Sequence, residues 1–270
     1  MITKERILLS LFTLLAVTAF IKAQLPKEQI FSLYNQANQD FSRANSTDDT
    51  EHAKKLYKKA ILGFERIIDE GQVKNAKLYY NLANAYLLHG QIGKAILNYR
   101  RAERHDGSDQ NIKKNLTFAR SKRTDKFVIK AEKRVLQTLF FWHYDFSLQT
   151  KFLLMCIFFG TVCLSSTAVI KFGRNSSLLA VIIICGIIII CLFASVVIES
   201  KKQTDTIYGI ITAEEIVARQ GDGQNYPESF KAPLHEGTEF ELLEHRPQWL
   251  HIKLSDDSDA WIPVDSAELV

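Results

Sequence analysis

Two long apolar runs interrupt an otherwise charged chain. Residues 152–170 and 178–198 are almost continuously apolar, and the two predicted spans are 151–171 and 178–198. Each run of about 20 residues, at 1.5 Å per residue in a helix, is long enough to cross the roughly 30 Å hydrocarbon core of a bilayer. No polar alternation or turn interrupts either run, which argues against a buried β-rich core. The pattern therefore predicts two transmembrane α-helices in a multi-domain membrane protein.

Residues 1–23 have the order of a secretory signal peptide. Lys4 and Arg6 precede an apolar run, and the small residue Ala23 follows it. Cleavage after Ala23 fits this order. The alternative is an uncleaved membrane anchor, because Ile21 is larger than the small residues preferred near a cleavage site. Either outcome exports the chain that follows.

The polar link between the two apolar runs sets the orientation in the membrane. It contains Lys171 and Arg174 and no acidic residue, so the positive-inside rule places it in the cytoplasm. The flanking residues 24–150 and 200–270 then lie on the opposite side. We expect a bacterial inner-membrane protein with two spans and both aqueous modules in the periplasm.

Residues 25–120 have the spacing of a helical repeat. Between Lys74 and Gly107, small and aromatic residues recur at intervals typical of one helix, a tight turn and a second helix. These residues are Tyr79, Leu82, Ala83, Tyr86, Gly90, Ala95, Tyr99 and Ala102. The pattern resembles the tetratricopeptide repeat and predicts an α-helical tetratricopeptide-repeat module.

A weaker copy of this pattern lies earlier in the module, around Tyr34 and Phe64. It differs by a polar insertion at 43–52, about ten residues relative to the 34-residue period. Beyond Gly107, an amphipathic segment that contains Leu116 predicts a helix that caps the last repeat.

The first helix of each repeat lines the concave face with which such modules bind a peptide or a partner protein. The polar residues of that face are the candidate partner-binding residues. They are Lys77, Tyr80, Asn81, Asn84 and Asn35. The alternative is that they are ordinary solvated positions, as exposed polar residues on a helix usually are.

Residues 203–270 change to short runs of alternating apolar and polar residues. Five such runs in about 60 residues predict a small all-β barrel. Trp249 and Trp261 would anchor its core or a surface groove. The pattern resembles a bacterial SH3-like domain, which implies binding of a peptide or of peptidoglycan. Three aspartates at 256–259 are expected to form a solvated turn, since the spacing of a calcium loop is missing.

Residues 121–150, between the repeat module and the first span, are first basic and then aromatic. Six lysines and arginines between Lys122 and Arg134 precede a cluster that includes Trp142 and Tyr144. Aromatic rings settle at the headgroup level and basic side chains near anionic lipid. The segment predicts a juxtamembrane helix against lipid, and a solvated helical linker stays open as the alternative.

Charge and motifs narrow the classes of function. Residues 203–270 hold fourteen acidic and four basic residues, whereas the rest of the chain is basic, and an acidic terminal module argues against nucleic-acid binding. All four cysteines lie inside the apolar runs, so no disulfide framework is expected. The segment from Gly90 to Lys94 lacks the spacing of a phosphate-binding loop. No catalytic or metal-ligand spacing occurs elsewhere, so we expect no enzyme, cofactor or metal site.

The order of these parts resembles the BatE family, a component of the Bacteroides aerotolerance operon. The resemblance rests on the signal peptide, the repeat with Tyr79-Tyr-Asn-Leu-Ala-Asn-Ala-Tyr86 and Gly93-Lys-Ala-Ile-Leu-Asn-Tyr99, the two spans and the SH3-like domain. It implies a membrane complex with von Willebrand factor A-type Bat proteins, encoded beside a MoxR-type ATPase, and a link to oxidative stress. The insertion at 43–52 departs from the pattern and puts a partner site on the first repeat in doubt.

Two classes of function follow from this sequence. In the first, the chain is a scaffold whose repeats and SH3-like domain dock other membrane proteins. In the second, it is a cell-envelope receptor whose SH3-like domain holds peptidoglycan or a peptide. A transmembrane sensor is a weaker third interpretation, because the cytoplasmic link is too short to carry a signalling module.

Overall fold

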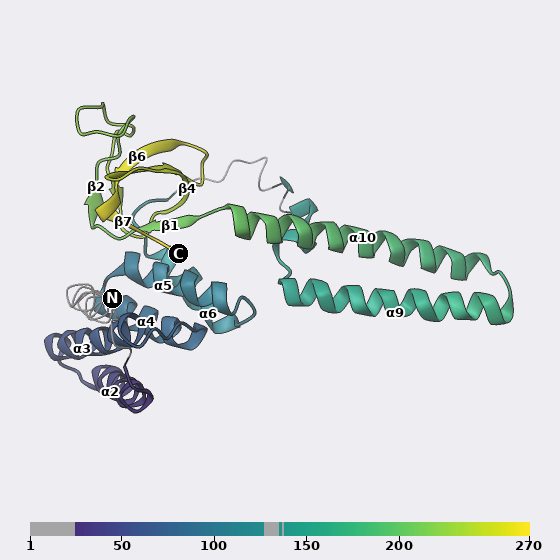
Figure 1. Cartoon of the computed structure of the whole chain (residues 1–270), viewed down its shortest axis with the longest axis horizontal. Helices are drawn as coiled ribbons and strands as arrows, with labels where there is room; N and C mark the ends of the chain where they lie inside the picture. The colour runs from purple at the N-terminus through teal and green to yellow at the C-terminus, as the bar shows by residue number, and fades with distance from the viewer. Residues whose placement is uncertain (1–24, 127–134, 137) are drawn as a thin grey trace, which may run out of the picture. The chain divides into compact units, whose positions relative to one another are not determined.

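The structure, a computed structural model, describes residues 25–126, 135–136 and 138–270 (Figure 1). The predicted signal peptide at 1–23 and much of the basic part of the juxtamembrane segment lie outside the described residues. The chain forms two compact units, residues 1–91 and 92–270. The boundary between them falls inside the predicted repeat module.

The described part of the first unit is helical. Its helices are α2 (Lys27–Ser46), α3 (Thr50–Asp69) and α4 (Ala76–His89). The Asp49 side chain caps α3 and the Asn75 side chain caps α4, each by accepting hydrogen bonds from otherwise unpaired N–H groups of the first turn. Gly90 ends α4 with φ of 97°, a left-handed conformation that glycine adopts without strain. The turn predicted at Gly90 is confirmed.

The polar insertion predicted at 43–52 lengthens two helices. α2 and α3 have 20 residues each, against 14 in α4. Ala44 of the insertion packs with Leu56 and Tyr57 of α3, and the Tyr57 hydroxyl donates to Asn45 Oδ1 at 2.7 Å. The insertion therefore contributes one residue to a small apolar cluster.

The second unit begins with α5 (Ile92–His105) and α6 (Gln110–Ser121). Asp109 caps α6 by accepting from the Asn111 N–H at 2.7 Å. Ile112, Leu116 and Ala119 recur at helical spacing and are almost wholly buried. The amphipathic helix predicted beyond Gly107 is thus present.

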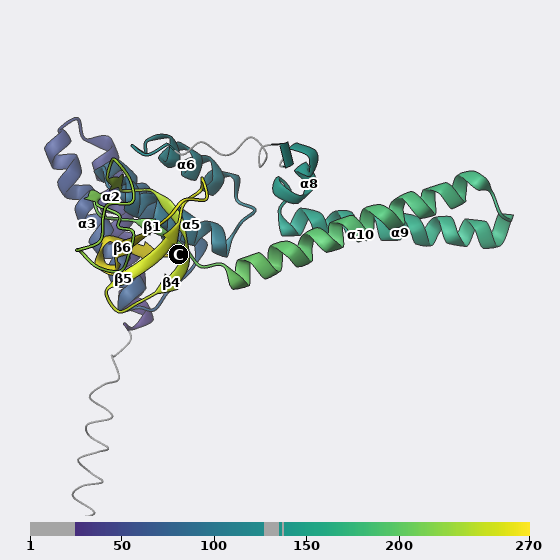
Figure 2. The same ribbon diagram turned by 90° about the horizontal axis from the view of Figure 1, so that it is seen from above.

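A pair of long antiparallel helices follows, lying side by side in both views (Figures 1 and 2). The short α8 (Phe141–Tyr144) precedes α9 (Leu148–Phe172) and α10 (Ser176–Asp205). Segments Leu148–Phe172 and Ser176–Lys201 are long and apolar enough to span a membrane. The predicted spans lie within them. Many of their large apolar side chains point outward, as lipid contact requires.

The chain ends in short antiparallel strands. They are β1 (Tyr208–Ile211), β2 (Glu215–Ile216), β3 (Leu234–His235), β4 (Glu239–His245), β5 (Trp249–Lys253), β6 (Asp259–Pro263) and β7 (Ala267–Leu269). Five form one sheet in the order β6-β5-β4-β1-β7, and β2 pairs with β3. These seven strands are two more than the five runs predicted, because β3 and β7, of two and three residues, give too short an alternation to recognise.

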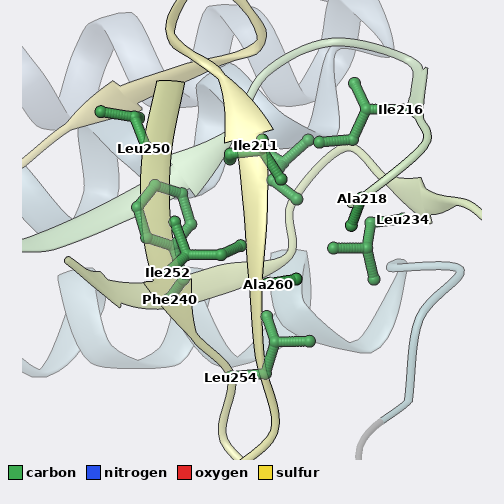
Figure 3. Packing of buried hydrophobic residues seen from close by; sticks show 10 residues of the cluster. Ile211, Ile216, Ala218, Leu234, Phe240, Leu250, Ile252, Leu254 and Ala260 are labelled. Carbon is green, nitrogen blue, oxygen red and sulfur yellow. The ribbon is translucent and has the colours of Figure 1, made fainter. Parts of the chain in front are cut away.

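Alternating side chains of this sheet build its core (Figure 3). Leu250 and Ile252 of β5 point inward, while Trp249, His251 and Lys253, which alternate with them, are half-buried. Phe240 packs across Gly209, where a Cβ atom would come within 2.3 Å of the Phe240 ring. Gly209 is therefore required for β1 and the ring to approach.

Candidate functional site

The residues predicted to bind a partner come from α2 and α4, and polar contacts join these helices. Asn81 Nδ2 on α4 donates to Tyr34 Oη at 3.2 Å and to Asn38 Oδ1 at 3.3 Å, both on α2. Asn38 Nδ2 also donates to the Tyr34 carbonyl at 2.8 Å. Asn81 therefore links α4 to α2 through the amide and phenol groups of Asn38 and Tyr34.

The predicted residues differ in how accessible they are. Asn35 and Lys77 are exposed. Tyr80, Asn81 and Asn84 are half-buried. Lys77, Asn81 and Asn84 follow one another at intervals of four and three residues, so they share one side of α4. Asn81 holds α2 and α4 together, which gives it a structural role whether or not a partner binds.

The two tryptophans predicted for a groove lie on one face of the β5–β6 hairpin. Trp249 pairs with Pro263, and His251 pairs with Trp261, so all four side chains point away from the core. The His251 ring stacks on Trp261 with centroids 4.7 Å apart and planes 4° apart. His251 Nε2 also lies 2.8 Å from Asp259 Oδ2.

Arg246 completes the surroundings of Trp261. Its guanidinium carbon lies 4.5 Å from the centre of the Trp261 ring, and Glu244 and Asp222 accept hydrogen bonds from it. These hydrogen bonds, first the one to Glu244 and then the one to Asp222, raise the pKa of Arg246. Trp261 is flanked by His251 and Arg246 and is only 9% exposed, whereas Trp249 is half-buried and more accessible.

A cluster of arginines around Glu239 joins α5 and α6 to the sheet. Arg120 donates from Nε and Nη2 to the two Glu239 oxygens at 2.7 Å each, and Arg123 Nη1 donates at 3.3 Å. Arg100 Nε lies 3.6 Å from the same carboxylate. Burial opposes the charge on Glu239, but hydrogen bonds and charge from Arg120, with Arg100 and Arg123, lower its pKa overall. Arg123, which the sequence assigns to the lipid-facing segment, points to the sheet.

Asp125 makes a second polar contact with the sheet. Its carboxylate accepts from the His235 N–H at 2.7 Å and the Thr238 hydroxyl at 2.7 Å, and lies 2.8 Å from His235 Nδ1. Burial would raise the pKa of Asp125, but the hydrogen bonds from Thr238 and His235 lower it overall. The segment that follows α6 is therefore attached to β3 and the start of β4.

The start of α5 approaches the β module closely. Gly93 donates its N–H to Glu236 Oε2 at 2.9 Å, so a residue far along the chain caps α5. A Cβ atom at Gly93 would lie 2.7 Å from the Ile211 carbonyl oxygen. At the other end of α5, Arg101 Nη2 donates to the Leu269 carbonyl at 2.9 Å. The helix thus contacts both β1 and β7.

A polar cluster lies at the open end of the helix pair. Lys151 is completely buried, and its ammonium donates to the Glu199 carboxylate and, at 2.8 Å, to the His143 carbonyl. His143 Nδ1 lies 2.7 Å from Ser195 Oγ. These contacts attach the aromatic α8 to both long helices.

Sequence reasoning missed the contacts between the helices and the sheet. Glu239 and Asp125 stand in ordinary charged surroundings, and nothing in their spacing marks a contact over more than a hundred residues. The signal in the sequence that could have indicated such contacts is the charge segregation, an acidic terminal module after a basic chain.

The described residues contain no group of histidine, cysteine, aspartate or glutamate side chains that could hold a metal ion. No protein-family model matches the chain, and no curated protein matches it.

Proposed function

We propose that the protein is a non-enzymatic membrane scaffold that docks other membrane proteins through the α2–α4 face. The observation that carries this proposal is the continuous row of Tyr34, Asn38 and Asn81 across two helices. Amide side chains both donate and accept hydrogen bonds, so a row of them suits the backbone of an extended peptide. The tetratricopeptide resemblance leads to the same face.

Side chains at the border of this face favour a partner that carries apolar and acidic residues. Lys77 supplies an exposed positive charge, and Phe31, one turn before Asn35, is 68% exposed. An exposed phenylalanine beside amides offers an apolar anchor of the kind found at binding hot spots. The face therefore suits a segment with an apolar residue and an acidic residue.

The proposed number of membrane crossings is supported by a contact between the segment before α9 and the segment after α10. Arg120 precedes α9, Glu239 follows α10, and the two side chains form a bidentate ion pair. Segments that touch in this way lie on the same side of a bilayer, which supports an even number of crossings between them. With the basic link in the cytoplasm, the repeats and the SH3-like domain lie in the periplasm of a bacterial inner membrane.

Partners follow from the resemblance to the BatE family. In this proposal the docked proteins are von Willebrand factor A-type Bat proteins, and the complex serves aerotolerance. The SH3-like domain is a second contact in the same assembly.

Crosslinked pull-down from membranes tests the scaffold. The full chain is compared with an Asn35→Asp, Lys77→Glu double variant, and Lys59→Glu on α3 serves as an exposed charge-reversal control. We expect the double variant to capture von Willebrand-type proteins at least about tenfold less, since the loss of each contributing interface side chain costs more than about 1 kcal/mol. Equal capture by all three chains would contradict docking at this face.

The β5–β6 face favours a second candidate, a cell-envelope receptor. The flanked Trp261 and the more accessible Trp249 form an aromatic surface next to charged groups, which suits a peptide or peptidoglycan strand. Sedimentation of the full chain in detergent with purified cell wall tests this function. Trp249→Ala should abolish co-sedimentation, whereas Leu243→Ala, an exposed apolar control on β4, should leave it unchanged.

A further inference from the structure

The outward side of α6 is basic and lacks any acidic residue. Residues 110–124 contain five lysines and arginines and no aspartate or glutamate. Arg120 and Arg123 turn inward to Glu239. Lys114 and Lys122 remain exposed, on the side of the helix opposite its buried apolar residues.

An exposed aromatic residue lies between these two lysines. Phe118 is 52% exposed, and Lys122 Nζ lies 5.1 Å from the centre of its ring. Lys114 and Phe118 are four residues apart and share one side of α6, and Lys122, the residue that caps the C-terminal end of α6, extends this stripe through its contact with Phe118. A bare aromatic ring flanked by lysines is the composition of a helix that lies at a membrane surface.

The chain holds α6 close to the bilayer. Arg120 is bound to Glu239, and Glu239 pairs with Ile210 of β1. Ile210 follows the apolar helix that ends at Lys201 by nine residues, four of them still in α10. At 1.5 Å per helical residue and 3.4 Å per extended residue, that distance is at most about 23 Å. The C-terminal end of α6 therefore lies within reach of the headgroup region.

We propose that the stripe of Lys114, Phe118 and Lys122 is a membrane-contact surface that binds anionic lipid headgroups. The lysine ammonium groups neutralise headgroup phosphates, and Phe118 enters the boundary between headgroups and acyl chains. This contact is separate from the two spans and from partner docking by the α2–α4 face. It fixes the orientation of the α5–α6 and sheet assembly relative to the bilayer.

Lysine acetylation followed by mass spectrometry tests this surface on the full chain in nanodiscs. One set of discs contains only phosphatidylcholine, and the other includes phosphatidylglycerol. We expect Lys114 and Lys122 to react about fivefold more slowly in the anionic discs, as for a lysine held at an anionic surface, and high salt to remove the difference. Lys231, exposed on the β module, should react equally in both.

Variants separate the aromatic contribution from general electrostatics. Phe118→Ser should abolish the slower acetylation of Lys114 in anionic discs, whereas Leu62→Ser, an exposed apolar control on α3, should preserve it. Fast acetylation of Lys114 in both kinds of disc overturns the proposal, because lipid would then not cover the stripe. Slow acetylation of Lys114 in both kinds of disc also overturns it, because a protein surface and not anionic lipid would then cover the stripe.

Discussion

Replacing Glu239 by glutamine should loosen the attachment of α6 to the sheet. Glutamine keeps the size of the side chain but removes the charge that three arginines share. Breaking a buried ion pair costs about 3–5 kcal/mol, and breaking an exposed one about 0–1 kcal/mol. The Glu239 side chain is 22% exposed and the Arg120 side chain 33% exposed, so we expect an intermediate cost of about 2 kcal/mol.

Hydrogen exchange of the full chain in detergent measures this cost locally. A loss of about 2 kcal/mol in the free energy of local opening should speed exchange of β4 and α6 amides about 30-fold. Glu70→Gln is the matched control, because Glu70 pairs with Arg66 on the surface, with side chains 40% and 53% exposed. The control should change exchange by about twofold or less.

A double-mutant cycle decides whether the pair itself is responsible. Arg120→Met and Glu239→Gln together should cost at least about 1 kcal/mol less than the sum of the two single changes. Additive effects, or exchange in Glu239→Gln as slow as in the native chain, would refute the view that this pair attaches α6 to the sheet.

Three further predictions concern other contacts of the second unit. Gly93→Ala should speed exchange at the start of α5 because its Cβ would lie 2.7 Å from the Ile211 oxygen, whereas Gly107→Ala, with 3.4 Å to its nearest contact, should have little effect. The structure lowers the pKa of Asp125, so the Asp125 carboxylate stabilises the folded state fully above its unfolded pKa of about 3.9. This stabilisation is lost as the pH falls through the lower pKa of the folded state, and hydrogen exchange of the β3 amides should then become faster. Asp125→Asn should remove this acid sensitivity. Cys185 is buried and Cys163 exposed, so a lipid-soluble maleimide should label Cys163 faster, and equal labelling would contradict the packing of α9 on α10.

Local signals in the sequence account for the elements that were predicted. The two apolar runs predict long helices from their length alone, and Gly90 predicts a turn from its backbone conformation. Neither prediction depends on a residue far away in the sequence. Helical spacing alone predicts α6, since Ile112, Leu116 and Ala119 form one apolar stripe. These features could be predicted because each is determined within a few turns of chain.

The contacts of the candidate sites depend on residues far apart in sequence. Asn81 was predicted to face a partner, and its hydrogen bonds to α2 required the packing of two helices separated by 29 residues of chain. Trp261 was predicted as a groove residue, but its stacking on His251 depends on the register of β5 and β6. One residue of register shift would turn the opposite set of side chains outward.

The segregation of acidic and basic residues along the sequence corresponds to ion pairs within the second unit. An acidic module after a basic chain argued only against nucleic-acid binding. In the structure, Glu239 lies among arginines of α5 and α6, and Arg101 lies 3.2 Å from Glu268. Opposite charges therefore attach the segment before the apolar helix pair to the segment after it. The helices α9 and α10 therefore form a hairpin whose two flanking segments are bound to each other.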